Sequence, residues 1–290
     1  MNQSWKNTAA RFLTAQTISL FGSSLVQYAI VWYITLSTSS GRMLTISTVC
    51  GFAPQIAISL FAGVWIDCYD RKLLIMLSDT IIALSTLILA IAFLSGHRNI
   101  WLLFTVLMVR SAGTGIQTPA VNAVIPQIVP QKHLMQVNGI QNTLTSLIMF
   151  LSPAVSGAIL SVSTLETTLF IDVFTALIGV GITSALTIPG YRKDMMAGSD
   201  NAGRKDGLKS RDNIKESSGI LSMKQGFLYL KTDSFVRHLL LFQIVVLFLI
   251  SPSAFLTPLM VSRTFGPEVW RLTASEMTYS MGSVLGGILI

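Results

Sequence analysis

Long apolar runs alternate with short polar connections along the chain, and this pattern predicts helices that cross a membrane. Each run reaches the ~20 residues that a helix needs to span a hydrocarbon core. The runs are continuous rather than alternating in polarity, which favours helices over the strands of a membrane barrel. Seven complete spans are expected at residues 12 to 36, 44 to 66, 73 to 95, 100 to 121, 139 to 162, 167 to 188 and 237 to 260, and an eighth begins near residue 273.

The composition agrees with a membrane protein and excludes several other classes. Of the 290 residues, 51 % are hydrophobic and only 11 % are charged, whereas a soluble domain carries about 25 % charged residues. A soluble enzyme, a disulfide scaffold and a disordered chain are therefore excluded. The two cysteines and three histidines are too scattered for a metal site. We find no nucleotide-binding loop and no nucleophile with a base, so we expect no enzyme, no metal and no cofactor.

The positions of the cations predict the orientation in the membrane. Cytoplasmic connections retain Lys and Arg. With the N-terminus inside, only Arg42, Arg98, Arg263 and Arg271 remain outside, Arg110 lies within a span, and the rest of the 20 cations lie inside. These cations follow the edges of loops without interleaved aromatic residues, which does not favour a nucleic-acid partner. We therefore expect a multi-pass protein with a cytoplasmic N-terminus.

The longest polar stretch divides the chain. Residues 189 to 222 are rich in Gly, Ser, Asp, Lys and Arg, which is typical of a flexible linker. Residues 220 to 229 mix apolar and polar positions and suggest a short helix on the membrane surface. The expected organisation is a six-span bundle at residues 1 to 188, a basic cytoplasmic linker at 189 to 236, and the first spans of a second bundle at 237 to 290.

Three charged residues fall well inside predicted spans, away from their ends, where each charge costs ~2.5 to 3.5 kcal/mol unless it finds a partner or water. Arg110 lies ~14 Å beyond Trp101 at 1.5 Å per residue, near the middle of its span. Asp79 lies ~10 Å beyond Lys72, and Asp172 lies near the start of the sixth span among apolar residues. Each could tie two helices together. Alternatively, they could form a central cavity that binds substrate or a proton.

The first span carries a polar stripe. Gln16, Ser19, Ser23 and Gln27 follow one another at spacings that place them on one helix face. The stripe is expected to face the protein interior. It could line a polar path or form a helix-packing seam, because hydroxyl residues also favour close helix contact.

The connection between the second and third spans carries a family signature. From Gly63 to Lys72 it reads GVWIDCYDRK, which resembles the Gly-x-x-x-Asp-x-x-Gly-Arg-Lys/Arg loop of the major facilitator superfamily. Gly63 is expected to permit close helix contact, and Asp67 and Arg71 are expected to lie within reach of each other. Asp70 replaces the usual glycine, and Asp tolerates the left-handed backbone conformation better than most residues.

Two further spans resemble motifs of the same superfamily. The fourth span reads LMVRSAGTG around Arg110, similar to the arginine motif of proton-coupled members. The fifth span contains SPAVSG, with Pro153 and Gly157 where antiporters show Gly-Pro-x-x-Gly-Gly. The sequence RSAGTGIQTPAVNAVIP, which starts at Arg110, is similar to the macrolide-efflux branch. The resemblance extends over the whole chain.

This resemblance implies an all-α, major-facilitator-type bundle in the cytoplasmic membrane of a bacterium. It implies export of amphipathic drugs, macrolides above all, by proton antiport with alternating access and without a cofactor. The loop residues Gly63, Asp67, Asp70, Arg71 and Lys72 would act as a conformational lock. Proton coupling or the substrate cavity would involve Arg110, Asp79, Asp172, Gln16 and Gln27. The expected partners are a small amphipathic substrate, protons and lipid, and the full-length protein would be monomeric.

Two alternatives remain open. A related transporter could export a siderophore or another metabolite instead of a drug. Superfamily members have twelve spans, whereas this sequence stops within the eighth, so the chain is also expected to be truncated. A truncated chain could be a membrane fragment that does not transport.

The topology can be tested by labelling a cysteine in the linker. In Ser210→Cys, an impermeant thiol reagent added to intact cells should label the protein only after the membrane is permeabilised, because the basic linker is expected in the cytoplasm. Efficient labelling in intact cells would contradict the predicted orientation.

Overall fold

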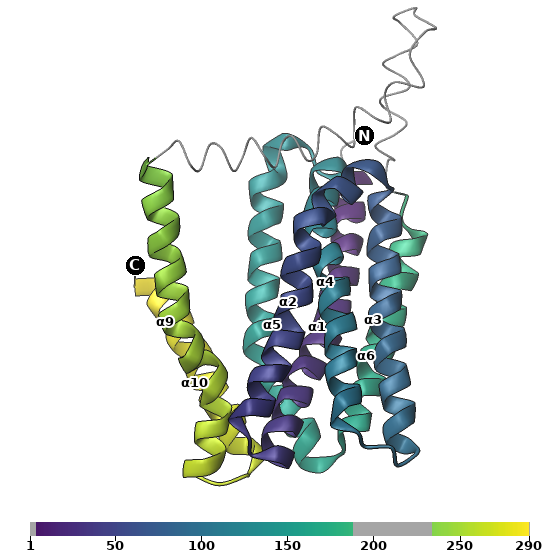
Figure 1. The fold of residues 1–290 in the computed structure, drawn as a ribbon. Helices are drawn as coiled ribbons and strands as arrows, with labels where there is room; N and C mark the ends of the chain where they lie inside the picture. Colours follow the sequence, from purple (N-terminus) through teal and green to yellow (C-terminus); the bar gives the residue numbers. More distant parts are fainter. Residues whose placement is uncertain (1–3, 188–233, 290) are drawn as a thin grey trace, which may run out of the picture.

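The described structure is helical throughout. A computed structural model describes residues 4–187 and 234–289, and the regular elements of this part are α-helices and one short 3₁₀ helix (Figure 1). In chain order they are α1 (Ser4–Thr38), α2 (Gly41–Cys68), α3 (Arg71–Leu94), α4 (Ile100–Ile128), η1 (Gln131–His133), α5 (Leu134–Val162), α6 (Leu165–Ala185), α9 (Ser234–Thr264) and α10 (Val269–Leu289). The predicted all-α class is confirmed.

The helices agree with the predicted spans in number and differ from them in length. Seven of the described helices are long and apolar enough to cross a membrane, as the apolar runs predicted, and α10 contains the start of the eighth run. Several helices continue into polar sequence, because backbone hydrogen bonding does not stop where the hydrophobic run stops. The predicted linker and surface helix fall almost entirely outside the described residues.

The first six helices pack in two related sets of three. α1 packs against α5 and α6, while α4 packs against α2 and α3, and the contact of α3 with α6 joins the two sets. If α1 is exchanged with α4, α2 with α5 and α3 with α6, the same pairs of helices are again in contact. Such a relation is expected of the inverted three-helix repeats that build six-span transporter bundles.

Small residues allow the close helix contacts within the bundle. A Cβ atom on Gly115 of α4 would lie 2.8 Å from the Gln55 carbonyl oxygen of α2, and one on Gly179 of α6 would lie 3.0 Å from the Ser19 Cβ atom of α1. The backbone amide of Gln55 also donates a hydrogen bond to the Ser111 hydroxyl of α4, across 3.0 Å. Small side chains therefore set the helix spacing here, as is usual where lipid provides no hydrophobic drive for association.

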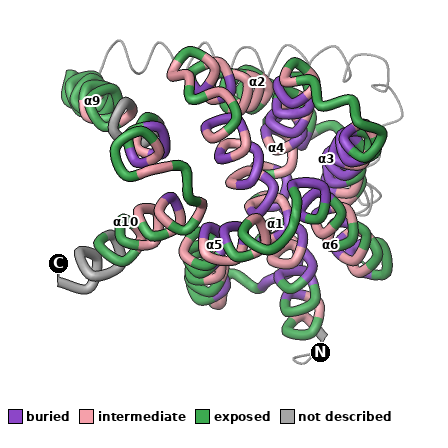
Figure 2. The backbone as a smooth tube through the Cα atoms, turned by 90° about the horizontal axis from the view of Figure 1, so that it is seen from below, coloured by how far each residue is buried: buried purple, intermediate pink, exposed green. Residues whose placement is uncertain are grey.

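The interior has an apolar cluster at each end and polar side chains between them. The cluster at the N-terminal end, where α1, α3 and α5 begin, includes Phe12, Ile75 and Ile125. The cluster at the opposite end includes Ile30 and Leu107, both essentially inaccessible. Figure 2 shows that buried positions gather where α1, α3, α4 and α6 face one another. The middle layer holds the charged and hydroxyl groups described below.

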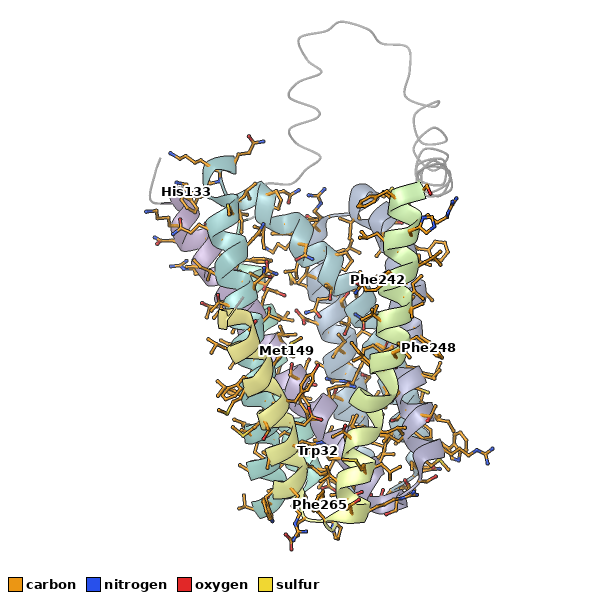
Figure 3. All side chains as sticks on the ribbon, turned by 90° about the vertical axis from the view of Figure 1, so that its left-hand side faces the viewer. Trp32, His133, Met149, Phe242, Phe248 and Phe265 are labelled. Carbon is orange, nitrogen blue, oxygen red and sulfur yellow. The ribbon has the colours of Figure 1, made fainter. Side chains whose placement is uncertain are left out.

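α9 and α10 lie beside the six-helix bundle rather than within it. α10 packs on α5, and Trp32 of α1 forms a buried cluster with Val261 and Leu272. Much of α9 is exposed, and its Phe242 and Phe248 side chains are 68 % and 76 % exposed (Figure 3). Apolar side chains exposed in this way suit contact with lipid or with further helices.

The packing of Gly115 predicts opposite effects for two Gly→Ala substitutions. Gly115→Ala should lower the melting temperature in detergent, because the new Cβ overlaps α2 and overpacking costs ~1 to 3 kcal/mol. Gly181→Ala is the matched control, since a Cβ there meets no described atom within 4 Å, and Ala improves helix propensity by about 1 kcal/mol. Equal melting temperatures for the two variants would contradict the packing of α2 on α4.

Candidate functional site: a polar layer across four helices

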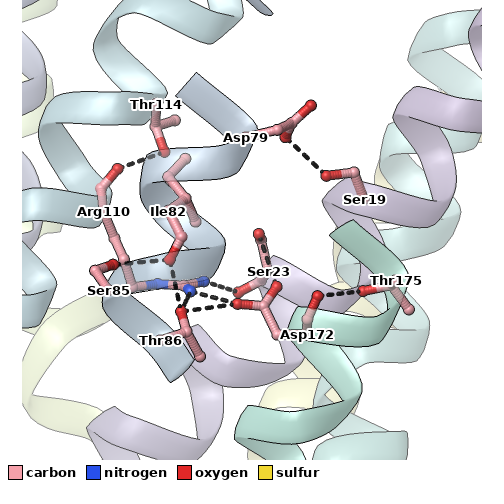
Figure 4. Close-up of polar contacts among 10 residues, drawn as sticks. All are labelled: Ser19, Ser23, Asp79, Ile82, Ser85, Thr86, Arg110, Thr114, Asp172 and Thr175. Atoms are coloured by element: carbon pink, nitrogen blue, oxygen red, sulfur yellow. Dashed lines mark hydrogen bonds and ion pairs between the residues drawn. The ribbon is translucent and has the colours of Figure 1, made fainter. Parts of the chain in front are cut away.

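Arg110 of α4 is the cation at the centre of the bundle. Its side chain is 6 % exposed, and its Nη1 atom lies 2.5 Å from Asp172 Oδ2 of α6. The same Nη1 atom donates to the Thr86 hydroxyl of α3, and Nη2 donates to the Ser23 carbonyl of α1 across 3.1 Å. One guanidinium group therefore joins four helices (Figure 4).

Asp172 is surrounded by donors. Its side chain has no exposed surface. Oδ1 accepts a hydrogen bond of 3.1 Å from the Ser23 hydroxyl, and Oδ2 accepts from Arg110 and from the Thr86 hydroxyl, which lies 3.0 Å away. Both oxygens of the carboxylate are thus satisfied. A buried ion pair is tolerated when further hydrogen bonds complete its geometry, and removing one partner costs ~3 to 5 kcal/mol.

Asp79 of α3 forms a second polar cluster nearer the N-terminal end. Its Oδ1 atom accepts hydrogen bonds from the Ser19 hydroxyl at 2.8 Å and from Gln117 Nε2 at 2.6 Å. Its Oδ2 atom is buried and has no hydrogen-bond partner among the described residues. The side chain therefore differs from Asp172, which is paired with a cation.

The polar stripe of α1 faces the interior over part of its length. Ser19 and Ser23 contact the two acids, as described above. Gln16 Nε2 is buried without a hydrogen-bond partner in the described part of the chain. Gln27 is half-buried and faces α2, with its Nε2 atom 3.6 Å from the position of a Cβ on Gly51. The structure thus joins the middle of the stripe to the acids and leaves its two ends outside the hydrogen-bonded clusters.

The connection between α2 and α3, which carries the signature-like sequence, forms hydrogen bonds with α4 and with the C-terminal end of α6. Asp70 caps α3, accepting a 2.9 Å hydrogen bond from the Lys72 amide. Arg71 Nη1 donates to the Ala123 carbonyl of α4 across 2.8 Å. Lys72 Nζ donates to the carbonyls of Ser184 and Leu186, at 2.8 and 2.7 Å, where α6 ends. A cation is favourable at this site because carbonyls at a helix C-terminus carry partial negative charge.

Two expectations about this loop were wrong. Asp70 has φ −65°, so the turn does not require a left-handed residue there, and aspartate serves as a helix cap instead. Gly63 is exposed, and a Cβ on it would meet no described atom within 4 Å, so the expected close helix contact is absent from the described residues. The Asp67 side chain lies outside the described structure, although its backbone lies in α2.

The antiporter-like segment of α5 lies at a helix contact. α5 continues through Pro153 without a break. The Ser156 hydroxyl donates to the Leu25 carbonyl of α1 across 3.1 Å. A Cβ on Gly157 would collide with Thr273 of α10. This segment therefore packs between α1 and α10 and does not contribute to the polar clusters.

Sequence reasoning missed Thr86 and Gln117. Thr86 is fully buried and contacts both members of the ion pair. Thr86 follows Asp79 by two helical turns, so both lie on one face of α3. This spacing was the sequence signal that could have identified Thr86 as a residue of the site. Gln117 has a similar relation to Arg110 on α4. Hydroxyl and amide residues are common in membrane helices, so their type alone did not identify them.

These features define a polytopic membrane protein with a charged layer buried in its helical bundle. Among the described residues, no group of three His, Cys, Asp or Glu side chains could hold a metal ion. Residues 12–290 match the sequence pattern of the Major Facilitator Superfamily. The chain belongs to this superfamily, and the predicted family resemblance is confirmed.

Several relatives are similar over much of the chain. Macrolide efflux protein A of Streptococcus pyogenes is 29 % identical over 286 residues, which cover 99 % of this chain and 66 % of that protein. The protein of the same name from Enterococcus faecalis is 29 % identical over 251 residues, 87 % of this chain and 72 % of that protein. The staphyloferrin A transporter of Staphylococcus aureus is 22 % identical over 160 residues, 54 % of this chain and 40 % of that protein. The chain thus spans 66 % of the length of the Streptococcus pyogenes relative.

The role of Thr86 can be tested by removing its hydroxyl. Thr86→Val should lower the free energy of unfolding by ~1 to 3 kcal/mol, because it removes one hydrogen bond from each member of the buried ion pair. Thr80→Val is the matched control, since Thr80 is exposed on the same helix and, within the described structure, its hydroxyl bonds to the Met76 carbonyl of its own helix. The control should change stability by less than about 0.5 kcal/mol. Equal effects in detergent unfolding would contradict a structural role for the Thr86 hydroxyl.

Proposed function

We propose that this chain belongs to a secondary active exporter of amphipathic drugs, with macrolides as the favoured substrates, driven by proton antiport. The observation that carries this proposal is the buried layer of Arg110, Asp172 and Asp79 in the middle of a six-helix bundle. Intramembrane ionisable groups of this kind mark ion and substrate pathways. The names of the two macrolide efflux relatives support macrolides as the substrate class.

The mechanism requires a bundle with two orientations. In transporters built from inverted repeats, one set of helices rocks against another around a site near the bilayer midplane. A proton bound to a carboxylate in this layer changes the local charge. It then biases the orientation by the difference in its binding free energy between the two states. The polar layer lies between two apolar clusters, a position suited to this role.

The signature loop would bias the same equilibrium from the cytoplasmic side. Arg71 and Lys72 hold backbone carbonyls of α4 and of the segment that ends α6. Contacts made in only one orientation can shift the equilibrium by their differential energy. We assign the loop to a conformational lock, with Gly63, Asp67 and Asp70 as its further members. The N-terminus and this loop would both face the cytoplasm of a bacterium.

The other site residues predicted from the sequence have roles in the same transport cycle. Gln16 and Gln27 of the α1 stripe would line the polar path or cavity. Pro153 and Gly157 would let α5 move against α1 and α10, because proline removes one backbone hydrogen bond and glycine permits close approach. Lipid surrounds the exposed helix faces, no cofactor is needed, and the complete protein would act as a monomer.

A second candidate function is export of a siderophore or another metabolite. The similarity to the staphyloferrin A transporter favours it, but over 54 % of this chain, whereas the macrolide efflux relative is similar over 99 %. A third possibility is a chain that inserts in the membrane without transporting. A transport measurement with several substrates separates all three.

Drug efflux in cells tests the proposal. Cells that express the chain should accumulate less radiolabelled macrolide than vector controls, and a protonophore should abolish the difference. Arg110→Lys should lower efflux at least about tenfold at an equal amount of protein in the membrane. Lysine keeps the charge but cannot reproduce the planar fork of donors to three helices. Arg98→Lys is the matched control and should leave efflux unchanged. The Arg98 side chain is 59 % exposed and lies in the connection between α3 and α4, outside the buried layer.

Different results would support different alternatives. Gradient-dependent export of a siderophore without macrolide export would favour the second candidate. Accumulation equal to the vector control for every substrate would favour the non-transporting chain. Full efflux by Arg110→Ala would contradict a coupling role for Arg110.

A further inference from the structure

The two buried acids of the polar layer have different hydrogen-bond partners. Asp172 accepts from three donor groups distributed over both of its oxygens, and one of them is the Arg110 guanidinium. This arrangement fits an ionised carboxylate, which only accepts hydrogen bonds. Arg110 stays protonated in proteins, so the pair retains its attraction. Protonating Asp172 would place a hydrogen on an oxygen already occupied by donors.

Asp79 has the opposite arrangement. Both of its donors, Ser19 and Gln117, bond to Oδ1, and Oδ2 has no partner among the described residues. The residue is only 3 % exposed. An ionised carboxylate with a bare, buried oxygen and no cation is costly. A neutral carboxyl matches the pattern, with Oδ1 as the accepting carbonyl and Oδ2 as the oxygen that carries hydrogen.

Within residues 4–187 and 234–289, the charged groups around Asp79 do not supply a counter-ion. The helices packed on α3 are chiefly α4 and α6, whose nearby charges are Arg110 and Asp172. These two form an ion pair with each other, so Arg110 is already neutralised. α1 contributes the uncharged Ser19 and Gln16 on the face that meets Asp79.

We infer that Asp79 carries the proton that is exchanged for substrate, while Asp172 remains ionised as the fixed counter-ion of Arg110. The Asp79 carboxylate takes up one proton to become a neutral carboxyl and later releases that proton on the other side of the membrane. This division of roles rests on the proposed proton antiport and specifies its site. Ser19 and Gln117 are positioning residues that hold Oδ1 and leave Oδ2 available.

Infrared spectroscopy distinguishes the two acids without requiring transport. In the purified chain, a protonated carboxyl gives a C=O stretching band that an ionised carboxylate lacks. We expect such a band in neutral buffer and its loss on alkaline titration. Asp79→Asn should remove the band. The double variant Arg110→Met/Asp172→Leu, which removes the other acid together with its cation, is the control that should retain it. Loss of the band in this double variant with its persistence in Asp79→Asn, or the absence of any such band at neutral pH, would overturn the assignment.

A third variant tests the positioning role. Gln117→Leu removes one of the two hydrogen bonds to Oδ1, so the carboxyl band should persist and move to higher frequency. An unchanged frequency would contradict the placement of Gln117, because a purely structural role elsewhere in α4 would not affect this vibration. Gln127→Leu, at the far end of the same helix, serves as the control and should leave the frequency unchanged.

The results separate this inference from the proposed function. A band assigned to Asp79 in a chain that exports no drug would refute only the proposed export. Gradient-driven export by a chain whose Asp79 shows no protonated band at any pH between acidic and neutral would refute only the role of Asp79.

Discussion

The Arg110–Asp172 ion pair is the interaction on which the arrangement of the bundle depends. Neither charge is tolerated alone in the middle of an apolar environment, so α4 and α6 must approach at this level. Thr86 and Ser23 complete the hydrogen bonding and bring α3 and α1 to the same point. The pair therefore fixes how four of the first six helices stand relative to one another.

This constraint explains the layered interior. The apolar clusters at the two ends pack without specific bonds, whereas the charged groups of the middle layer need hydrogen-bond or ionic partners. Asp79 is the exception among the three charged groups of this layer, because one of its oxygens has no described partner. The ion pair fixes the helices, and the acid without a cation is the group in this layer that can respond to a proton.

The sequence predicted the spans well and the site only in part. Spans follow from continuous apolar runs, because a membrane leaves few alternatives to a helix. Arg110 and Asp172 were each identified as costly charges, but their pairing depends on helix packing that no short-range pattern encodes. Thr86 and Gln117 were missed for a different reason: each follows an identified charge by two helical turns, but hydroxyl and amide residues are common in membrane helices. The role of Asp70 as a helix cap was not predicted, because the comparison with the signature directed attention to its backbone conformation.

A double-mutant cycle on the ion pair tests this account most directly. The free energy of unfolding in detergent would be measured for Arg110→Met, for Asp172→Leu and for the double variant. We predict that each single variant loses ~3 to 5 kcal/mol, because it leaves a buried charge without a partner, and that the double variant loses less than either. Losses in the double variant equal to the sum of the two single losses would contradict the claim that this pair organises the bundle.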